Sequence, residues 1–466
     1  MHILVFRRAG FVLLALAHML CGAIMSAIES EVLKMVKPAP AQDKKVLSIV
    51  DELSKKVLTE SRKIDVHVDL MLVGSVAKGT HLKDPDIDLF MLFPESTSPE
   101  KMKEAGLELG RRVIKGREHY AQHPYVRGIY KGFQVDLVPA FKIRDTRSKM
   151  SAVDRTPFHT DFVKKHLPKG VADEVRLLKR FMKGIGCYGA EAKVQGFSGY
   201  LCELLVMRFG NFRKVLEAST EWKVGEALEL PDHPGNEFPE PLTFVDPVDS
   251  TRNVASAVAP DTLLRFIVAS REYLKSPRIE FFFPKEPEVW SPGRIKEVAG
   301  ARMANVLSID FPKLDLIDDV TYPQLRKSLT AVTALLERSE FEIEKTSIFV
   351  DSESHLLIEM ASMSLPKTRK HRGPPVNSEN VTEFLAKWNS LGVSKPYTEN
   401  DRWYVMTERQ FENADALVRA KIGMLPLGKD VQKQGGFEVV SGEALFDKGH
   451  LAALTHHFDE RMPWQR

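Results

Sequence analysis

The chain is poor in cysteine and has little net charge. Only three cysteines occur in 466 residues, at positions 21, 187 and 202, and no two of them have the spacing of a CxxC pair. This excludes a disulfide scaffold and a cysteine-based zinc site, and it favours a reduced, cytoplasmic setting. The formal net charge is only +3, so any surface that binds a polyanion must be a local basic patch.

Long hydrophobic runs are also scarce, with one exception near the N-terminus. Arg7 and Arg8 precede the apolar run 10–24, which is typical of a signal-peptide core. The run is short for a transmembrane helix, His18 interrupts it, and no A-x-A cleavage site follows. We interpret residues 1–24 as an apolar extension from a mis-assigned start, with Met25 as the first residue. Secretion or membrane anchoring is the alternative, and we expect no stable membrane association.

Length and composition predict two to four globular domains. Hydrophobic residues make up 43% and charged residues 28% of the chain, which is enough apolar material for several cores. We predict an α+β, multidomain protein with boundaries near residues 158 and 278. The first part reads as a small mixed domain, with strands at 66–73 and 86–93 and a hairpin over 125–143.

The remaining two thirds change character twice. Residues 159–278 have helical periodicity, and the proline-rich, acidic stretch 229–249 reads as a surface loop. Residues 279–466 regain strands and helices in a ferredoxin-like order, the scaffold that RNA-recognition modules also use. We place the strands of this region near 305–311, 341–349, 355–361 and 402–408, and its helices near 322–337 and 379–389.

Acidic residues in the first part point to a metal site. Asp86 and Asp88 stand two apart in a strand, so both side chains leave the same face. Asp136 lies in the Val- and Leu-rich strand "QVDLVPA", where an unpaired charge is costly. If the two strands are neighbours, three carboxylates converge on one or two Mg²⁺ ions. Such a site neutralises charge during a phosphoryl displacement.

A glycine turn precedes these acids. Gly74 and Ser75 end a strand and open a helix, a geometry that lets backbone N–H groups approach a phosphate, and Lys78 follows one turn later. Each feature alone is a weak signal, because Gly-Ser turns and D-x-D pairs occur by chance. Their order along the chain is what makes them informative together.

The segment "GSVAKGTHLKDPDIDLF" resembles the signature of the polymerase-β nucleotidyltransferase superfamily. Further motifs, "SAVDRTPFH", "EVRLLKRFMKGIGCYGAE", "GFSGYLCELL", "VDPVDSTRNVA" and "KHRGPPV", resemble the class I (archaeal-type) CCA-adding enzymes, from about Met25 to the C-terminus. The resemblance implies a polymerase-β-like nucleotidyltransferase catalytic domain at 25–158. It also implies a helical central nucleotide-recognition domain at 159–278 and a ferredoxin/RRM-like tRNA-binding body and tail at 279–466.

The resemblance also implies roles for individual residues. The three acids would hold the catalytic Mg²⁺, and Ser75 and Lys78 would contact the triphosphate of CTP or ATP, although relatives often have arginine at the latter place. The implied nucleotide contacts farther along the chain are Arg155, His159, Lys179, Tyr188 and Arg252, the last reading the base edge. Arg176, Lys179 and Lys183 also form a basic stripe at helical spacing.

Simpler interpretations of these residues remain open. From the pattern alone, His159 and Tyr188 could be core residues, Arg252 could form a surface salt bridge, and the basic stripe could be a solvated helix face. At the level of function, the alternatives are a poly(A) or poly(U) polymerase, an enzyme that modifies a small molecule, and a catalytically inactive RNA-binding relative.

The RNA partner implied by the resemblance is tRNA, bound through its acceptor and TΨC arms. The basic run "KTRKHRGPPV" at 367–376 suits contacts with phosphates of a helical stem, although a solvated turn would look the same. The sequence leaves open whether the chain forms a homodimer.

Overall fold

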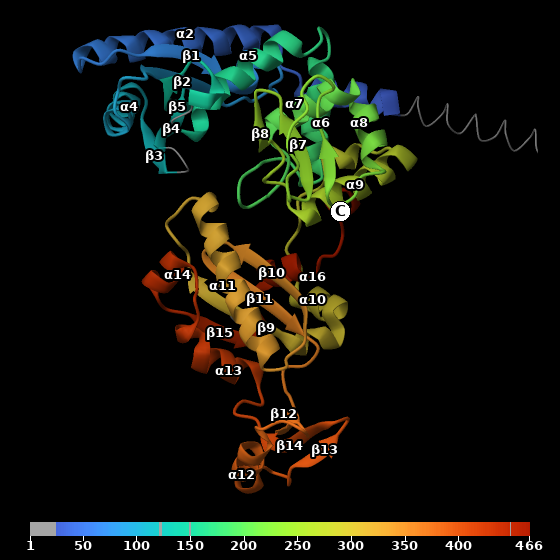
Figure 1. The fold of residues 1–466 in the computed structure, drawn as a ribbon. Helices are drawn as coiled ribbons and strands as arrows, with labels where there is room; N and C mark the ends of the chain where they lie inside the picture. Colours follow the sequence, from blue (N-terminus) through green and yellow to red (C-terminus); the bar gives the residue numbers. More distant parts are fainter. Residues whose placement is uncertain (1–24, 121–123, 149–150, 448) are drawn as a thin grey trace, which may run out of the picture. The chain divides into compact units, whose positions relative to one another are not determined.

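We describe the protein from a computed structural model, over residues 25–120, 124–148, 151–447 and 449–466 (Figure 1). Two compact units make it up. The first runs to Glu286 and also includes Arg461–Arg466, and the second spans Pro287–Glu460. The predicted extension 1–24 lies outside the described residues. Within the described ranges, no helix has both the length and the apolar character needed to cross a membrane.

The first unit contains a five-stranded sheet with the order β1-β2-β5-β4-β3. β2 and β5 are parallel, and the other neighbouring strands are antiparallel. Four of the five strands lie close to the positions predicted from alternation and turn residues, whereas β3 was not predicted. Their bounds are β1 (Asp69–Val73), β2 (Ile87–Pro94), β3 (Gly116–Tyr120), β4 (Pro124–Tyr130) and β5 (Phe133–Lys142).

Two long helices, α2 (Pro40–Lys63) and α4 (Pro99–Val113), cover one face of this sheet. Ser98 caps α4, because its hydroxyl accepts a hydrogen bond from the Lys101 N–H at 3.2 Å. The side chains of β2 alternate, so Leu89 and Met91 pack toward the helices while Asp88 leaves the opposite face. The helices therefore fix which face carries the acidic residues.

The rest of the first unit is mostly helical, as predicted, and its core is rich in packed aromatic rings. Short elements also occur here: α3 (Gly74–Lys78), η1 (Thr146–Ser148), η2 (Ala152–Arg155) and η3 (Ile279–Phe281). The longer helices are α5 (Thr156–His166), α6 (Ala172–Gly184), α7 (Gly199–Phe209), α8 (Phe212–Ser219) and α9 (Pro260–Lys275).

The predicted surface loop over 229–249 is wrong in its second half. Residues 242–246 form β7 (Leu242–Asp246), a strand that is buried along its whole length. It pairs with β6 (Glu226–Leu228) and β8 (Asp249–Asn253). The prolines that suggested a loop flank a short apolar run, and burial of that run on the helical core makes it a strand.

The last six residues of the chain pack on the first unit. Trp464, in η6 (Pro463–Gln465), is 1% exposed, and its ring stacks on that of Phe281 at 5.2 Å between centroids. Its indole N–H donates to Glu272 Oε2 at 2.6 Å. The chain thus leaves the first unit after Glu286 and returns to it at Arg461.

The second unit is built on a four-stranded antiparallel sheet with the order β10-β11-β9-β15. This is the predicted ferredoxin-like order. One face packs on α11, α13 and α14, and the other on α10 and α16. The bounds are α10 (Pro292–Ala299), η4 (Gly300–Asn305), β9 (Val306–Pro312), α11 (Asp318–Arg338), β10 (Ile343–Val350), β11 (Glu353–Met360), α13 (Ala414–Lys421), η5 (Ile422–Met424), α14 (Lys429–Gln434), β15 (Glu438–Ser441), α15 (Ala444–Asp447) and α16 (Leu451–Phe458).

One predicted strand of the ferredoxin-like order belongs to a different sheet. The strand near 402–408 forms, as β14 (Arg402–Glu408), but it pairs with β12 (Thr368–Pro375) and β13 (Tyr397–Glu399). Together with α12 (Val381–Leu391), this small sheet is inserted between β11 and α13. The fourth position in the larger sheet goes to β15, which the sequence analysis missed because it is only four residues long.

Candidate active site

The pairing of β2 with β5 brings the predicted carboxylates together. Asp88 is the direct neighbour of Asp136 in the parallel register of these strands. Asp86 stands two residues earlier, just before β2, so its side chain leaves toward the same side. Three acidic side chains thus converge from two adjacent strands.

The electrostatics of these acids reflect their crowding. The pKa of Asp88 is raised from 3.8 to about 7, first by burial and then by the charges of Asp136 and Asp86. Burial also raises the pKa of Asp86, and Asp136 adds to the effect while Arg127 opposes it. The site therefore concentrates negative charge that a bound cation would relieve.

Arg127 holds Asp136 in place, and the sequence analysis did not identify it. Arg127 on β4 is the register partner of Asp136 on β5. Its Nε donates to Oδ1 at 2.7 Å and its Nη2 to Oδ2 at 2.6 Å, a bidentate pair. This pairing raises the pKa of Arg127 further above its ordinary value. In the sequence, Arg127 is one polar residue of an alternating hairpin strand and does not stand out. Only the β4–β5 register shows that its partner is Asp136.

The predicted glycine turn lies against the acids. Gly74 has φ of +70°, and a Cβ there would lie 2.0 Å from Asp88 Oδ2. Only glycine fits this close approach of backbone to carboxylate without strain. Ser75 follows in the first turn of α3, a five-residue helix that ends at Lys78 and is followed by Gly79 in the left-handed conformation.

A cavity of about 320 Å³ opens beside the turn. Its lining includes six of the ten residues predicted for the site. Asp136 is not among the lining residues, because its carboxylate faces Arg127. Asp84, Lys183 and Tyr200 also contribute to its wall. The predicted residues that line it are Ser75, Lys78, Asp86, Asp88, Lys179 and Tyr188.

Both predicted lysines of the cavity pair with one buried acid that the sequence analysis did not single out. Glu203 on α7 accepts from Lys78 Nζ at 2.5 Å and from Lys179 Nζ at 3.0 Å. Thr80 also donates its hydroxyl to Glu203. Burial favours the neutral carboxylic acid, but the two ammonium groups outweigh it and lower the pKa of Glu203 to about 2. The wall of the cavity is thus a fixed ion network.

The basic stripe on α6 divides between two roles. The Arg176 guanidinium does not line the cavity; it donates to the backbone carbonyls of Gly79 and His81, at 2.6 and 2.9 Å. It thereby anchors the segment that follows α3. Lys183 lines the cavity, lies 5.1 Å from the centre of the Tyr188 ring, and has a pKa lowered by burial.

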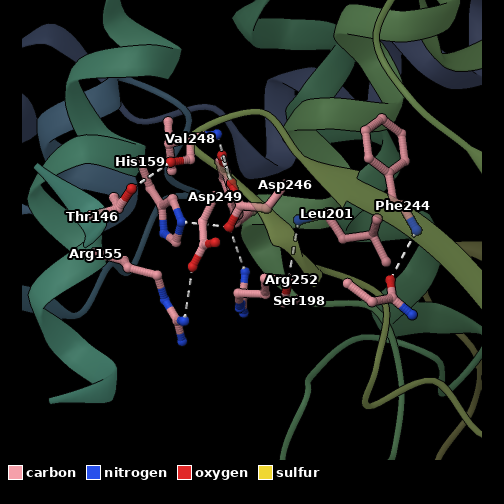
Figure 2. A network of polar contacts seen from close by, with 12 residues as sticks. Thr146, Arg155, His159, Ser198, Leu201, Phe244, Asp246, Val248, Asp249 and Arg252 are labelled. Atoms are coloured by element: carbon pink, nitrogen blue, oxygen red, sulfur yellow. Dashed lines mark hydrogen bonds and ion pairs between the residues drawn. The ribbon is translucent and has the colours of Figure 1, made fainter. Parts of the chain in front are cut away.

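The other predicted nucleotide contacts gather around two aspartates at the ends of β7 and β8 (Figure 2). His159 Nε2 lies 2.8 Å from Asp246 Oδ2, and Arg252 Nη1 donates to the same oxygen at 2.9 Å. Arg155 Nη1 donates to Asp249 Oδ2 at 3.3 Å. Hydrogen bonding to His159 lowers the pKa of Asp246 in spite of its burial. Asp246 lay in the predicted loop, so the sequence analysis missed it.

Tyr200 connects this cluster to the cavity. Its hydroxyl donates to Asp246 Oδ1 at 3.3 Å, and its ring stacks on His159 at 4.2 Å between centroids. The Lys78 ammonium lies 5.5 Å from the centre of the same ring. The end of the site that holds Asp86, Asp88 and Asp136 (the acidic end) and the residues around Asp246 (the Asp246 cluster) are therefore parts of one continuous polar site in the first unit.

The donors at the acidic end fit a divalent metal ion. Magnesium prefers carboxylate oxygens, and three carboxylates are available. Arg127 uses only two of the roughly four lone-pair positions of Asp136, which leaves acceptor capacity for a cation. The raised pKa of Asp88 shows that negative charge is crowded at this position, which a bound cation would offset. The residues that would hold the ion are Asp86, Asp88 and Asp136.

This crowding predicts a pH-dependent gain in stability from Asp88→Asn in metal-free protein. The pKa of this carboxyl is about 7 in the folded protein and 3.8 in the unfolded chain. The folded protein therefore loses stability as the pH rises from about 4 through 7, because the unfolded state releases the proton first. We expect the variant to be more stable by up to about 4 kcal/mol at pH 8, and by less than half of that at pH 5.

Urea unfolding in EDTA at the two pH values measures the effect. Asp69→Asn is the control, because the Asp69 side chain on β1 is 45% exposed and pairs with Lys142, so its loss should not stabilise the protein. A gain from Asp88→Asn that is equal at pH 5 and pH 8 would contradict the prediction.

Three protein-family models match most of the chain. A nucleotidyltransferase domain model matches residues 50–159, a model for the second domain of tRNA nucleotidyltransferases matches 173–283, and a model for the C-terminal domain of CCA-adding enzymes matches 302–442. A CCA-adding enzyme from Methanosarcina acetivorans is 39% identical, over 90% of this chain and 94% of that protein. The chain belongs to the family of CCA-adding enzymes.

A second relative also aligns over nearly its full length. A CCA-adding enzyme from Archaeoglobus fulgidus is 37% identical, over 92% of this chain and 97% of its own length. A solved structure of CdnC with ATP from E. coli aligns at 20% identity and a TM-score of 0.41, over 55% of this chain and 94% of that one, too distant to add to the assignment. This CCA-adding enzyme is thus a multidomain nucleotidyltransferase, as the motifs predicted.

Proposed function

We propose that this CCA-adding enzyme transfers C, C and then A from CTP and ATP to the 3′ end of tRNA without a nucleic-acid template. The observation that carries the proposal is the register pairing of Asp88 with Asp136 beside a cavity lined by Ser75 and Lys78. That arrangement suits in-line attack of the tRNA 3′-hydroxyl on the α-phosphate, with release of pyrophosphate. Because these substrates occur inside cells, we also propose a cytoplasmic location.

In this proposal the three acids hold Mg²⁺, which would neutralise the charge of the triphosphate and assist loss of the 3′-hydroxyl proton. Asp136, oriented by Arg127, would help to accept that proton. Ser75 and Lys78 would contact the phosphates, together with Lys179 and Lys183. Since Lys78 and Lys179 share Glu203, their positions are set before substrate arrives, which limits reorganisation during the reaction.

Base recognition would fall to the Asp246 cluster. Arg252 offers a planar fork of donors that can pair with acceptors on cytosine or adenine. Arg155, His159 and Tyr188 would complete the nucleotide contacts. We propose that residues 25–158 form the catalytic domain and 159–278 the nucleotide-recognition domain, a division that the matched ranges of the family models support.

Binding of the acceptor and TΨC arms of tRNA would belong to residues 279–466. The C-terminal family model supports this assignment, and so do exposed cations on β12, where Lys370 and Arg372 leave the same side of the strand. Lys370 also pairs with Glu399 and lies 4.2 Å from the centre of the Tyr404 ring, and both contacts hold its ammonium at the sheet surface.

Product length tests the proposed function. Protein starting at Met25 is incubated with Mg²⁺, CTP, ATP and a tRNA transcript that lacks its last three nucleotides, and the products are separated on a sequencing gel. We expect addition of C, C and A followed by a stop. A long homopolymer would replace the proposal with a poly(A) or poly(U) polymerase, and no addition at all would leave only RNA binding.

Arg252→Ala is expected to reduce nucleotide selectivity more than catalysis. A good bidentate contact contributes about 1–3 kcal/mol of discrimination, so the preference for CTP over UTP should fall roughly 10- to 100-fold. The ratio of kcat/KM values for the two nucleotides measures it. Arg271→Ala is the control, because Arg271 is an exposed residue on α9 whose guanidinium donates to the backbone carbonyl of Thr220, away from the Asp246 cluster. An unchanged ratio for Arg252→Ala would remove the proposed role.

A further inference from the structure

A second polar cluster lies in the other unit, on the ferredoxin-like sheet. Asp310 on β9 and His355 on β11 are register partners, and His450 stands immediately before α16. All three residues are at most 5% exposed. His355 Nδ1 lies 2.8 Å from Asp310 Oδ1, and His450 Nε2 lies 2.7 Å from Asp310 Oδ2. One ligand atom from each residue falls within 4.8 Å of the other two.

Further polar groups contact two of the three residues. A histidine that binds a metal usually gives its second ring nitrogen to a carboxylate, and His355 Nε2 lies 3.2 Å from Asp351 Oδ1. Ser308 donates its hydroxyl to Asp310 at 2.6 Å, which fixes that carboxylate in turn. Asp310 and His355 thus already have outer partners that orient them.

A neighbouring histidine on the same face shows how hydrogen bonding alone satisfies an imidazole. His457 is fully buried, and both of its ring nitrogens have partners, Ser347 at 2.8 Å and Glu359 at 3.1 Å. His450, by contrast, has a buried Nδ1 without a hydrogen-bond partner among the described residues. Its only polar contact there is therefore through the nitrogen that points at Asp310.

We propose that Asp310, His355 and His450 bind a zinc ion. Two imidazoles and one carboxylate suit Zn²⁺, whereas Mg²⁺ prefers an all-oxygen set such as that of the catalytic acids. Tetrahedral zinc with bonds of about 2.0–2.1 Å spaces its ligand atoms about 3.3 Å apart. The two histidine–aspartate distances, 2.8 and 2.7 Å, would therefore lengthen by about half an ångström when the ion binds. A water molecule would complete the coordination.

The site would join three segments that are distant in the sequence. β9 and β11 already pair. The ion would join His450, the residue just before α16, to these two strands, and the apolar side of α16 packs on the same sheet face. The zinc would thus stabilise the covering of that face by α16, independently of the catalytic acids.

Metal analysis of the full-length protein tests the proposal. The protein is expressed without a histidine tag in zinc-supplemented medium, and zinc is counted by mass spectrometry. We expect about one zinc per chain in the wild type and in Asp88→Asn, and less than about a fifth of that in His450→Asn. His457→Asn is the matched control and should keep its zinc.

Cobalt substitution gives a readout that needs no variant. Wild-type protein stripped of metal and loaded with Co²⁺ should show visible absorption of a tetrahedral or five-coordinate ion, and Zn²⁺ should abolish it. Zinc should also raise Tm of the stripped protein. Wild-type protein with no zinc, no cobalt spectrum and an unchanged Tm would overturn the proposal and make the cluster a hydrogen-bonded triad. Loss of zinc from Asp88→Asn would overturn it as well, by placing the ion in the catalytic site.

Discussion

Asp136→Asn is expected to slow nucleotide addition by roughly 10³-fold or more, because a metal-binding carboxylate contributes several kcal/mol of transition-state stabilisation and each 1.36 kcal/mol is a factor of ten. Asparagine keeps the shape of the side chain and its acceptor oxygen. It removes the negative charge that, beside Asp88 in the strand register, would hold the cation. The variant also leaves Arg127 without a charged partner, so positive charge remains where the cation should bind.

The initial rate of labelled CMP incorporation into tRNA lacking its last three nucleotides measures this effect. Asp69→Asn is the control, since Asp69 lies on β1 of the same sheet and its carboxylate contacts Lys142. That variant should retain wild-type turnover. Near-normal turnover of Asp136→Asn with magnesium would remove Asp136 from the catalytic triad of acids.

Glu203→Gln is expected to have the largest effect on stability, about 3–5 kcal/mol. The change leaves the buried ammonium groups of Lys78 and Lys179 without a compensating negative charge. Burial already lowers the pKa of Lys179, so its charged form depends on this carboxylate. Loss of the carboxylate should therefore loosen the contact between α3 and α7 as well as the wall of the cavity.

Urea unfolding at pH 7 gives the free energy, with Glu108→Gln as the control. Glu108 pairs with Arg112 across one turn of α4, and both side chains are 42% exposed. An exposed pair of this kind contributes less than about 1 kcal/mol. If Glu203→Gln is no less stable than Glu108→Gln, the two lysines are not charged in the folded protein.

The acidic end of the site was predictable because its signals lie in short stretches of sequence. A spacing of two in a strand fixes a shared face for Asp86 and Asp88, and a charge within an apolar strand marks Asp136. Glu203 carried the same kind of signal, a lone acid in the apolar helix "GYLCELLVMRF", and could have been found in this way. Its partners could not, because Lys78 and Lys179 are 125 and 24 residues away.

The missed residues depend on long-range pairing. Arg127 is recognisable only through the β4–β5 register, and Asp246 only once the segment before it is seen to be a buried strand. The same reason explains the ferredoxin-like sheet. Its first three strands were predicted near their positions, but the choice of β15 over β14 as the fourth is made by packing on β9, which periodicity does not encode.

The return of the chain to the first unit affects the order in which that unit can be completed during synthesis. A ribosome makes Trp464 only after all of residues 287–460. Until then the Phe281 ring lacks its stacking partner and Glu272 lacks the indole donor. A nascent first unit would thus expose part of its aromatic core while the second unit is being translated. A fusion partner placed directly after Arg466 would emerge beside this late-closing core, so an affinity tag there should follow a flexible linker.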